Sequence, residues 1–244
     1  CMQRKVALYF PKGMEKPYGE PILAKTGDPE IDSLVRDAWG YSKPLYPDKL
    51  AYKLIKNNYP NSQVGVAKHQ ISFVLKRKTP INFLLKTFGH YFWNRWFLNR
   101  IKNYQDFVGL NHYNRNIIDN GFGKNQDKPK TDFGWEYYPE SIYQSLIELN
   151  PYNKPIYITE NGIADAKDEK RGEFIVRALK SVSDAIKDGA DVRGYLYWSL
   201  LDNFEWDKGF WPRFGLIEID YKTQERKIRP SALIYKKLVE NNSL

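Results

Sequence analysis

The sequence predicts an α/β fold in which strands alternate with helices, and two observations support this prediction. Four apolar, strand-like runs can be placed, and polar, turn-forming or helical sequence follows each of them. Segments of helical character connect the runs, as expected where neighbouring strands are parallel and the chain must cross over between them. The alternation therefore favours a parallel sheet covered by helices.

The elements follow one another in a regular order. The strand-like runs are Gln63–Lys68, Asp106–Asn111, Pro155–Thr159 and Val192–Ser199. The helical segments are Pro47–Asn58, Phe83–Lys102, Pro139–Leu149, Lys170–Lys187 and Pro230–Glu240. Several of these helices have Pro, Ser or Asp near the start, where such residues favour initiation. Apolar residues recur at three- and four-residue spacing from Phe174 to Ile186, which predicts an amphipathic helix with one face on the sheet.

Residues 1–46 do not continue this pattern. They are rich in Pro and Gly and contain one plausible helix, at Pro29–Trp39. Because methionine stands second, after Cys1, we expect that the sequence does not begin at a natural start. We therefore predict two regions, a lead-in segment over residues 1–46 and the α/β region over residues 47–244.

A carboxylate directly follows the third strand-like run. Glu160 comes just past the apolar run Pro155–Ile158, and Asn161-Gly162 are expected to turn the chain behind it. Barrel enzymes keep their catalytic side chains where strands end in this way. We expect Glu160 to be held rigidly and directed at a pocket.

A second run, Tyr195–Trp206, combines aromatic rings with an acid. It contains Trp198, and it places Glu205 between Phe204 and Trp206. Indole rings stack on sugar faces and carboxylates accept hydrogen bonds from hydroxyl groups, so this composition suits a carbohydrate site. An acid between two large aromatic residues is costly to bury unless polar groups meet it. The two runs together predict half of a sugar-cleaving active site.

These runs, together with Asp106–Tyr113, Gly134–Glu140 and Arg213–Leu216, resemble the family 1 glycoside hydrolases. That family comprises β-glucosidases and β-galactosidases that cleave with retention of configuration. The resemblance extends from about Asp48 to the C-terminus. It implies a (β/α)8 TIM-barrel fold, of which residues 47–244 would supply about the last four βα units, the C-terminal half of the barrel.

The resemblance also implies roles for the residues around the acid. Glu160 matches the nucleophile, Tyr113 would hydrogen-bond Glu160 and keep it ionised and oriented, and Asn111 would line the site. His112 faces the opposite way by strand alternation, so it receives no role. Without the resemblance, a tyrosine at the end of an apolar strand would be interpreted as a core residue.

A further set of residues matches positions that bind the substrate. Trp198, Glu205 and Trp206 match positions that hold the non-reducing sugar, and Phe214 matches a pocket residue. Core packing is the alternative for Trp198. We expect Trp135 and the aromatic run from Tyr91 to Trp96 to be structural, with the run packed on the barrel because it repeats at helical spacing. The implied substrate is a small-molecule or oligosaccharide β-glycoside, and the mechanism needs no cofactor.

The acid that must protonate the leaving group is not evident. The resembled enzymes carry a Thr-x-Asn-Glu-Pro motif after the fourth strand, and this sequence contains none. Glu20-Pro21 matches only the end of that motif, and a surface turn is the simpler interpretation of it. Two functions therefore stay open: a hydrolase whose barrel is completed by further sequence, a complementary chain or a second copy, and a non-catalytic carbohydrate-binding remnant.

Composition argues against other functional classes. The net charge of +9 could favour nucleic acid or another anion, but apart from Lys76-Arg77-Lys78 the charges are scattered, so we rank this hypothesis last and expect no nucleic-acid partner. The three histidines lie far apart, so we predict no metal site.

No apolar run approaches membrane-spanning length, and the sequence has no signal-like start. With a single cysteine, we expect a cytoplasmic protein.

Overall fold

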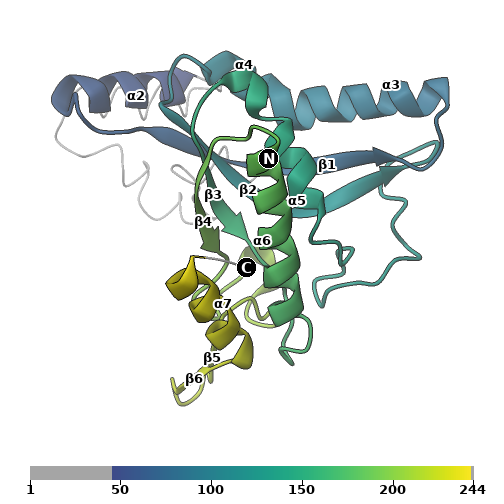
Figure 1. Cartoon of the computed structure of the whole chain (residues 1–244), viewed down its shortest axis with the longest axis vertical. Coiled ribbons are helices and arrows are strands. Elements are labelled where there is room, and N and C mark those ends of the chain that lie inside the picture. Colours follow the sequence, from purple (N-terminus) through teal and green to yellow (C-terminus); the bar gives the residue numbers. More distant parts are fainter. Residues whose placement is uncertain (1–45, 243–244) are drawn as a thin grey trace, which may run out of the picture. The chain divides into compact units, whose positions relative to one another are not determined.

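The computed structural model describes residues 46–242, and four of its strands form one sheet in the order β1-β2-β3-β4 (Figure 1). The strands are β1 (Gly65–Leu75), β2 (Phe107–Ile118), β3 (Ile156–Asn161) and β4 (Val192–Tyr197). The β2–β3 and β3–β4 pairs are parallel. All four predicted strands are thus confirmed, although β1 and β2 continue well past Lys68 and Asn111, and the sequence of β2 after Asn111 is largely polar.

The helices lie close to their predicted positions. They are α2 (Tyr46–Asn58), α3 (Pro80–Gly89), the π-helical η3 (His90–Arg95), α4 (Trp96–Ile101), α5 (Ser141–Ile147), the 3-10 segments η4 (Asn150–Tyr152) and η5 (Trp206–Lys208), α6 (Arg171–Lys187) and α7 (Pro230–Asn241). Two short strands, β5 (Ile217–Ile219) and β6 (Arg226–Ile228), form an antiparallel pair. The local sequence explains where some of the helices begin or end. Thr79 caps α3 by accepting a hydrogen bond from Asn82 N at 3.3 Å, and Gly189, with φ 96°, follows the end of α6.

The chain divides into two compact units. Within residues 46–242, the first comprises residues 46–66 and 96–107, and it is held by Asp106. The Asp106 carboxylate accepts hydrogen bonds from the Tyr52 hydroxyl and from Val64 N, both at 2.9 Å, and pairs with Lys56 at 2.8 Å. These contacts join helix α2 to the start of β2.

The second unit comprises residues 67–95 and 108–242, and helix α6 is the centre of its core. Helices α5 and α6 pack on each other, as do α6 and α7 (Figure 1). One side of α6 buries Phe174 and Ala178 against Ile163, and Ile175 packs against residues of β4 and the segment before β5. The predicted amphipathic helix is therefore confirmed, although Val176 and Ile186 lie on its exposed side.

The expectation that the aromatic run after α3 packs on a barrel holds within the described residues for Trp93, whose ring centroid lies 6.0 Å from that of His69 in β1. Tyr91, Phe92 and Trp93 remain 40%, 54% and 40% exposed. They lie in the π-helical segment η3, whose wider turn changes which side chains share a face, so residues at α-helical spacing no longer form one buried stripe. We call the exposed apolar residues of α3 and η3 the apolar strip; they are Ile81, Phe83, Leu84, Phe88, Tyr91, Phe92 and Trp93.

Some expectations fall outside residues 46–242. The helix at Pro29–Trp39 and the turn at Glu20 lie there, and the boundary after residue 46 stays a prediction. Within the described part of the chain, no helix has the length and apolar character that a bilayer crossing requires.

Candidate active site

Glu160 lies near the end of β3 and is held by a residue of the neighbouring strand. The Tyr113 hydroxyl donates a hydrogen bond to Glu160 Oε2 at 2.7 Å. A register shift between Leu110 and Asn111 places Asn111 opposite Glu160, and the Thr159 hydroxyl donates to Asn111 Oδ1 at 2.5 Å. The structure therefore brings together the three residues that the sequence grouped around the acid: Glu160, Tyr113 and Asn111.

Burial and hydrogen bonding act in opposite directions on the Glu160 carboxyl group. Burial raises the pKa of Glu160, and hydrogen bonds from Tyr113 and Asn111 lower it, with a net pKa above the ordinary value. The pKa of Tyr113 is raised well above its ordinary value, first by burial and then by the charge of Glu160. Tyr113 consequently stays protonated and available as a hydrogen-bond donor to the carboxylate.

Gly162 follows β3 because backbone from β4 passes very close to it. A Cβ atom at Gly162 would lie 1.8 Å from the Trp198 carbonyl oxygen, so no other residue fits without movement. Trp198 N also donates to the carbonyl of Asn161 at 2.9 Å. The expected turn at Asn161-Gly162 is therefore corrected: Asn161 is the last residue of β3, and Gly162 does not have a positive φ.

Asn161 connects the three neighbouring strands β2, β3 and β4. Its amide nitrogen donates to the His112 carbonyl at 2.6 Å, and its amide oxygen accepts from the Tyr195 hydroxyl at 2.8 Å. His112 is buried on the other face of β2, as expected from strand alternation, with its ring 2.8 Å from the Ser141 hydroxyl. Burial lowers the pKa of His112 to about 4, so the ring is a neutral part of the core.

Asp202 organises the segment that carries the other predicted binding residues. Its buried carboxylate accepts hydrogen bonds from Arg229 at 3.0 and 3.1 Å, from Arg213 at 3.2 Å and from Gly215 N at 2.9 Å. Ser199 N donates to the Phe214 carbonyl at 3.2 Å in the same region. The sequence analysis missed Asp202. The sequence feature that could have identified Asp202 is its position directly after the apolar pair Leu200-Leu201. A carboxylate that is buried in such a segment requires cationic partners.

Glu205 lies in the neighbourhood of Glu160 and Trp198. Burial raises the pKa of Glu205, the negative charge of Glu160 raises it further, and a hydrogen bond from the Trp198 side chain lowers it in part. Trp206 follows in η5 with its side chain 46% exposed, so it forms an open edge of this segment. The structure thus gathers Glu160, Glu205 and Trp198, while Trp206 lies at the surface.

Aromatic rings surround Tyr113. The Tyr113 ring centroid lies 5.3 Å from that of Trp135 and 6.1 Å from that of Phe214, which is almost completely buried. The Phe133 ring centroid lies 4.3 Å from that of Trp135 and 5.9 Å from that of Trp211. The expectation of a purely structural Trp135 is incomplete, because its ring borders the residue that holds Glu160.

Phe133 and Trp211 were missed by sequence analysis. The available signal for Phe133 was its pairing with Trp135 on either side of Gly134, which has φ 85° and turns the chain so that both rings face the same cluster. Among residues 46–242, no group of histidine, cysteine or acidic side chains is arranged to hold a metal ion.

Comparisons with known proteins identify the relatives of this chain. The family model described as Glycosyl hydrolase family 1 matches residues 53–244. A β-galactosidase from Sulfolobus acidocaldarius is 39% identical over 162 residues, covering 59% of this chain and 33% of the relative. β-Glucosidase A from Thermotoga maritima is 38% identical over 167 residues, covering 60% of this chain and 37% of the relative.

Comparison with solved structures also finds β-glucosidases that are similar to this chain. The crystal structure of a hyperthermophilic β-glucosidase from Pyrococcus furiosus matches with a TM-score of 0.75 and 32% identity, covering 89% of this chain and 48% of that one. The family 1 β-glucosidase from Thermotoga maritima matches with a TM-score of 0.73 and 28% identity, covering 82% and 56%.

The predicted fold class is confirmed, because these relatives are (β/α)8 barrels and the four-stranded parallel region corresponds to part of such a barrel. The chain spans about a third of the length of the curated relatives that it matches and about half of the solved chains. On the extent of the match to the family model, the chain belongs to glycosyl hydrolase family 1.

Proposed function

We propose that Glu160 is the nucleophile of a site that hydrolyses β-glycosides with retention of configuration. One carboxylate oxygen attacks the anomeric carbon while the bond from that carbon to the leaving-group oxygen breaks, and a protonated acid supplies the proton that the leaving oxygen needs. Water then hydrolyses the resulting glycosyl ester. The names of the relatives, β-galactosidase and β-glucosidase, support small-molecule or oligosaccharide β-glycosides as the substrate class.

The observation that carries this proposal is the 2.7 Å hydrogen bond from Tyr113 to the partly buried Glu160. A nucleophilic carboxylate must be ionised, and a fixed donor favours the ionised form against the effect of burial. The bond also fixes the direction of the carboxylate, which supports a role for Tyr113 as the residue that positions it. Asn111, which also lowers the pKa of Glu160 through its side chain, would line the site beside it.

The residues from β4 onward would hold the sugar. Glu205 would accept hydrogen bonds from sugar hydroxyl groups, and Trp198 and Trp206 would offer ring faces for stacking. Phe214 would close the floor behind Tyr113, because its buried ring packs against that residue. The charge of Glu160 raises the pKa of Glu205, which supports placing both carboxylates within one binding site.

We further propose that residues 47–244 act as the C-terminal half of a closed barrel. Strands β1 and β4 are the outer strands of the four-stranded sheet, and open edges of this kind need a partner. The apolar strip is a second surface that favours burial. Further sequence, a complementary chain or a second copy of this chain could complete the barrel, and the acid/base residue would come with that completion unless the partner is a second copy.

The proposal is tested by trapping the glycosyl-enzyme. The protein is incubated with an activated 2-deoxy-2-fluoro aryl glucoside and with the galactosyl analogue, and intact mass and peptide mapping follow. The fluorine slows the hydrolysis of the intermediate, and the activated leaving group needs little help from an acid. We expect one adduct on Glu160 and none in Glu160→Gln. The exposed Glu218→Gln is the matched control and should label like the wild type.

Failure of the trap would have a clear meaning. Folded wild-type protein that binds the sugar without forming an adduct would overturn the nucleophile assignment for this chain and favour a carbohydrate-binding function. An adduct on a carboxylate other than Glu160 would contradict the assignment directly.

A further inference from the structure

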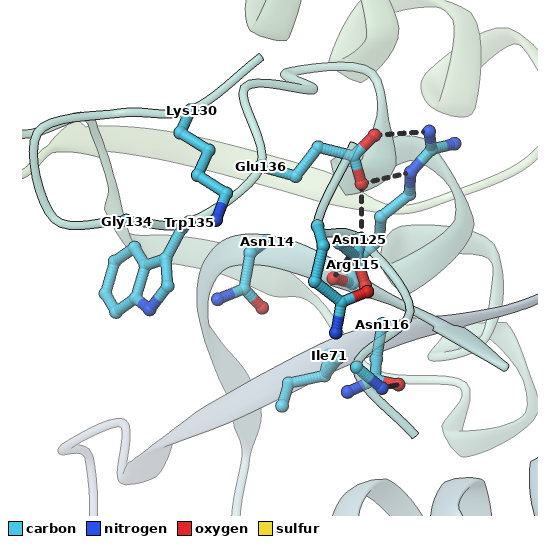
Figure 2. A pocket seen from close by; sticks show the side chains of 11 residues that line it. Ile71, Asn114, Arg115, Asn116, Asn125, Lys130, Gly134, Trp135 and Glu136 are labelled. Atoms are coloured by element: carbon cyan, nitrogen blue, oxygen red, sulfur yellow. Dashed lines mark hydrogen bonds and ion pairs between the residues drawn. The ribbon is translucent and has the colours of Figure 1, made fainter. Parts of the chain in front are cut away.

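A polar pocket adjoins the aromatic cluster that holds Tyr113. It has a volume of about 340 Å³ and is lined by Trp135, whose ring centroid lies 5.3 Å from that of Tyr113. Its remaining walls come from β1, from the end of β2 and from the loop after β2 (Figure 2). The pocket is therefore linked to the candidate nucleophile site through Trp135, which contacts Tyr113, the residue that holds Glu160.

The acidic residue that lines this pocket, Glu136, already forms an ion pair with Arg115. Arg115 donates to both Glu136 oxygens, at 2.6 and 2.9 Å, and Asn125 donates to Glu136 Oε2 at 2.5 Å. Burial alone would raise the pKa of Glu136, but the hydrogen bonds from Arg115 and Asn125 lower it overall, so the ion pair persists at neutral pH. Glu136 thus has little capacity left to accept hydrogen bonds from a ligand.

Lys130 is the charged side chain that remains among the residues that line the pocket. Lys130 extends along the pocket in the direction of Asn114 and Trp135 (Figure 2). No carboxylate among the described residues forms an ion pair with Lys130. Asn116 uses its amide oxygen to accept from Gly123 N at 2.8 Å, which leaves its amide nitrogen to donate. With Arg115 and Glu136 paired, Lys130 gives the pocket a charge of +1.

We propose that this pocket binds an anionic group on the leaving-group portion of the substrate, a carboxylate being the simplest case. This inference rests on the proposed function, because it assumes that the sugar sits at Glu160. The indole of Trp135 would stack on the ring that carries the anion, and Lys130 would donate to the anion itself. A cation without a paired acid favours such a ligand over a neutral one of equal size.

The test compares two probes that differ only in charge, 4-carboxyphenyl and 4-carbamoylphenyl β-D-glucopyranoside. Dissociation constants are measured on the full chain by ligand-observed NMR at low and high salt, and released phenol is quantified in the same samples. Because Lys130 is solvent-exposed, we expect the carboxylate probe to bind about two- to fivefold more tightly at low salt, with the preference shrinking at high salt.

Two variants test whether Lys130 causes the preference for the carboxylate probe. Lys130→Gln should remove the preference for the carboxylate. Lys124→Gln makes the same charge change on the same loop but outside the pocket lining, so it should keep the preference. Equal binding of the two probes by the wild type, no saturable binding of either probe, or a preference that both variants lose equally would each overturn the proposal.

The phenol measurement separates this proposal from the proposed function. A carboxylate preference that depends on Lys130, without release of phenol, would support the pocket and count against catalysis by this chain alone. Release of both phenols with no difference in affinity would support catalysis and overturn the anion pocket.

Discussion

The hydroxyl of Tyr113 donates a 2.7 Å hydrogen bond to Glu160 across neighbouring parallel strands. The bond joins two residues 47 positions apart and counteracts the effect of burial on the Glu160 pKa. A register shift at Leu110/Asn111 brings Asn111 opposite Glu160 in the same pair of strands. Both the charge and the orientation of the carboxylate therefore depend on how β2 and β3 are aligned.

Removing this hydrogen bond should shift the pH dependence of Glu160. In Tyr113→Phe the donor that lowers the pKa of Glu160 is lost while burial remains, so the pKa of Glu160 rises. The rate of inactivation by the fluorinated glucoside, which needs the ionised carboxylate, should fall about tenfold or more at neutral pH, since hydrogen bonds to charged groups contribute about 1.5–3 kcal/mol. The acid limb of the inactivation rate against pH should move to higher pH.

Tyr143→Phe is the matched control for that experiment. The Tyr143 hydroxyl also donates to a carboxylate, Asp188 at 2.6 Å, but at an exposed site between α5 and the end of α6. Its inactivation profile should match the wild type. An unchanged acid limb in Tyr113→Phe would show that the hydrogen bond does not control the charge of Glu160.

Glu160→Gln should stabilise the fold near neutral pH. Because the pKa of Glu160 is raised in the folded protein, its ionisation destabilises the folded state as pH rises through that pKa. The amide has no charge to desolvate. Its advantage in the free energy of unfolding should be present at pH 7 and should vanish below the ordinary carboxyl pKa of 4.5, where the wild-type side chain is protonated in both states. Urea titrations at pH 4 and pH 7 measure this. A difference that is independent of pH would contradict the interpretation.

Gly162→Ala should displace the backbone at Trp198. Its Cβ would lie 1.8 Å from the Trp198 carbonyl oxygen, so β3 and β4 would have to separate. We expect a loss of about 2 kcal/mol or more in the free energy of unfolding, together with loss of glycosyl-enzyme trapping. At Gly121, an added Cβ would meet Lys124 Cε at an ordinary 3.5 Å, so Gly121→Ala should be nearly neutral. Equal stabilities of the two variants would contradict the close approach.

Asp202→Asn should be strongly destabilising. The substitution leaves buried Arg229 without its bidentate carboxylate, and removal of one partner of a buried pair costs about 3–5 kcal/mol. Chemical denaturation measures the loss. Asp184→Asn, at an exposed pair with Lys187 on α6, should change stability by less than about 1 kcal/mol. A small effect at Asp202 would show that the segment from Trp198 to Phe214 is held by other contacts.

The apolar strip should make the isolated chain self-associate. Phe83, Leu84, Phe88 and Phe92 each expose half or more of their surface, and neighbouring apolar side chains of this kind favour association. Sedimentation velocity should therefore give a mass above the 28.8 kDa of one chain. A well-folded monomer at tens of micromolar would contradict completion of the barrel by a second copy.

Much of the fold was predictable because local patterns determine it. The apolar runs of β3 and β4 and the three- and four-residue spacing in α6 identified the strands and the amphipathic helix. The exposure of Tyr91–Trp93 was not predicted, because a π-helical segment changes which side chains share a face, and its spacing in sequence is the same as that of an α-helix.

The sequence by itself identified Glu160 as the candidate nucleophile and predicted the aromatic and acidic residues expected beside it. Only the tertiary structure decided the pairing of Tyr113 with Glu160, the burial of Asp202 between two arginines and the close approach that excludes a side chain at Gly162. Each of these contacts joins residues that are distant in sequence or on different strands. Their distances follow from strand register and backbone packing, which the order of amino acids along one segment does not reveal.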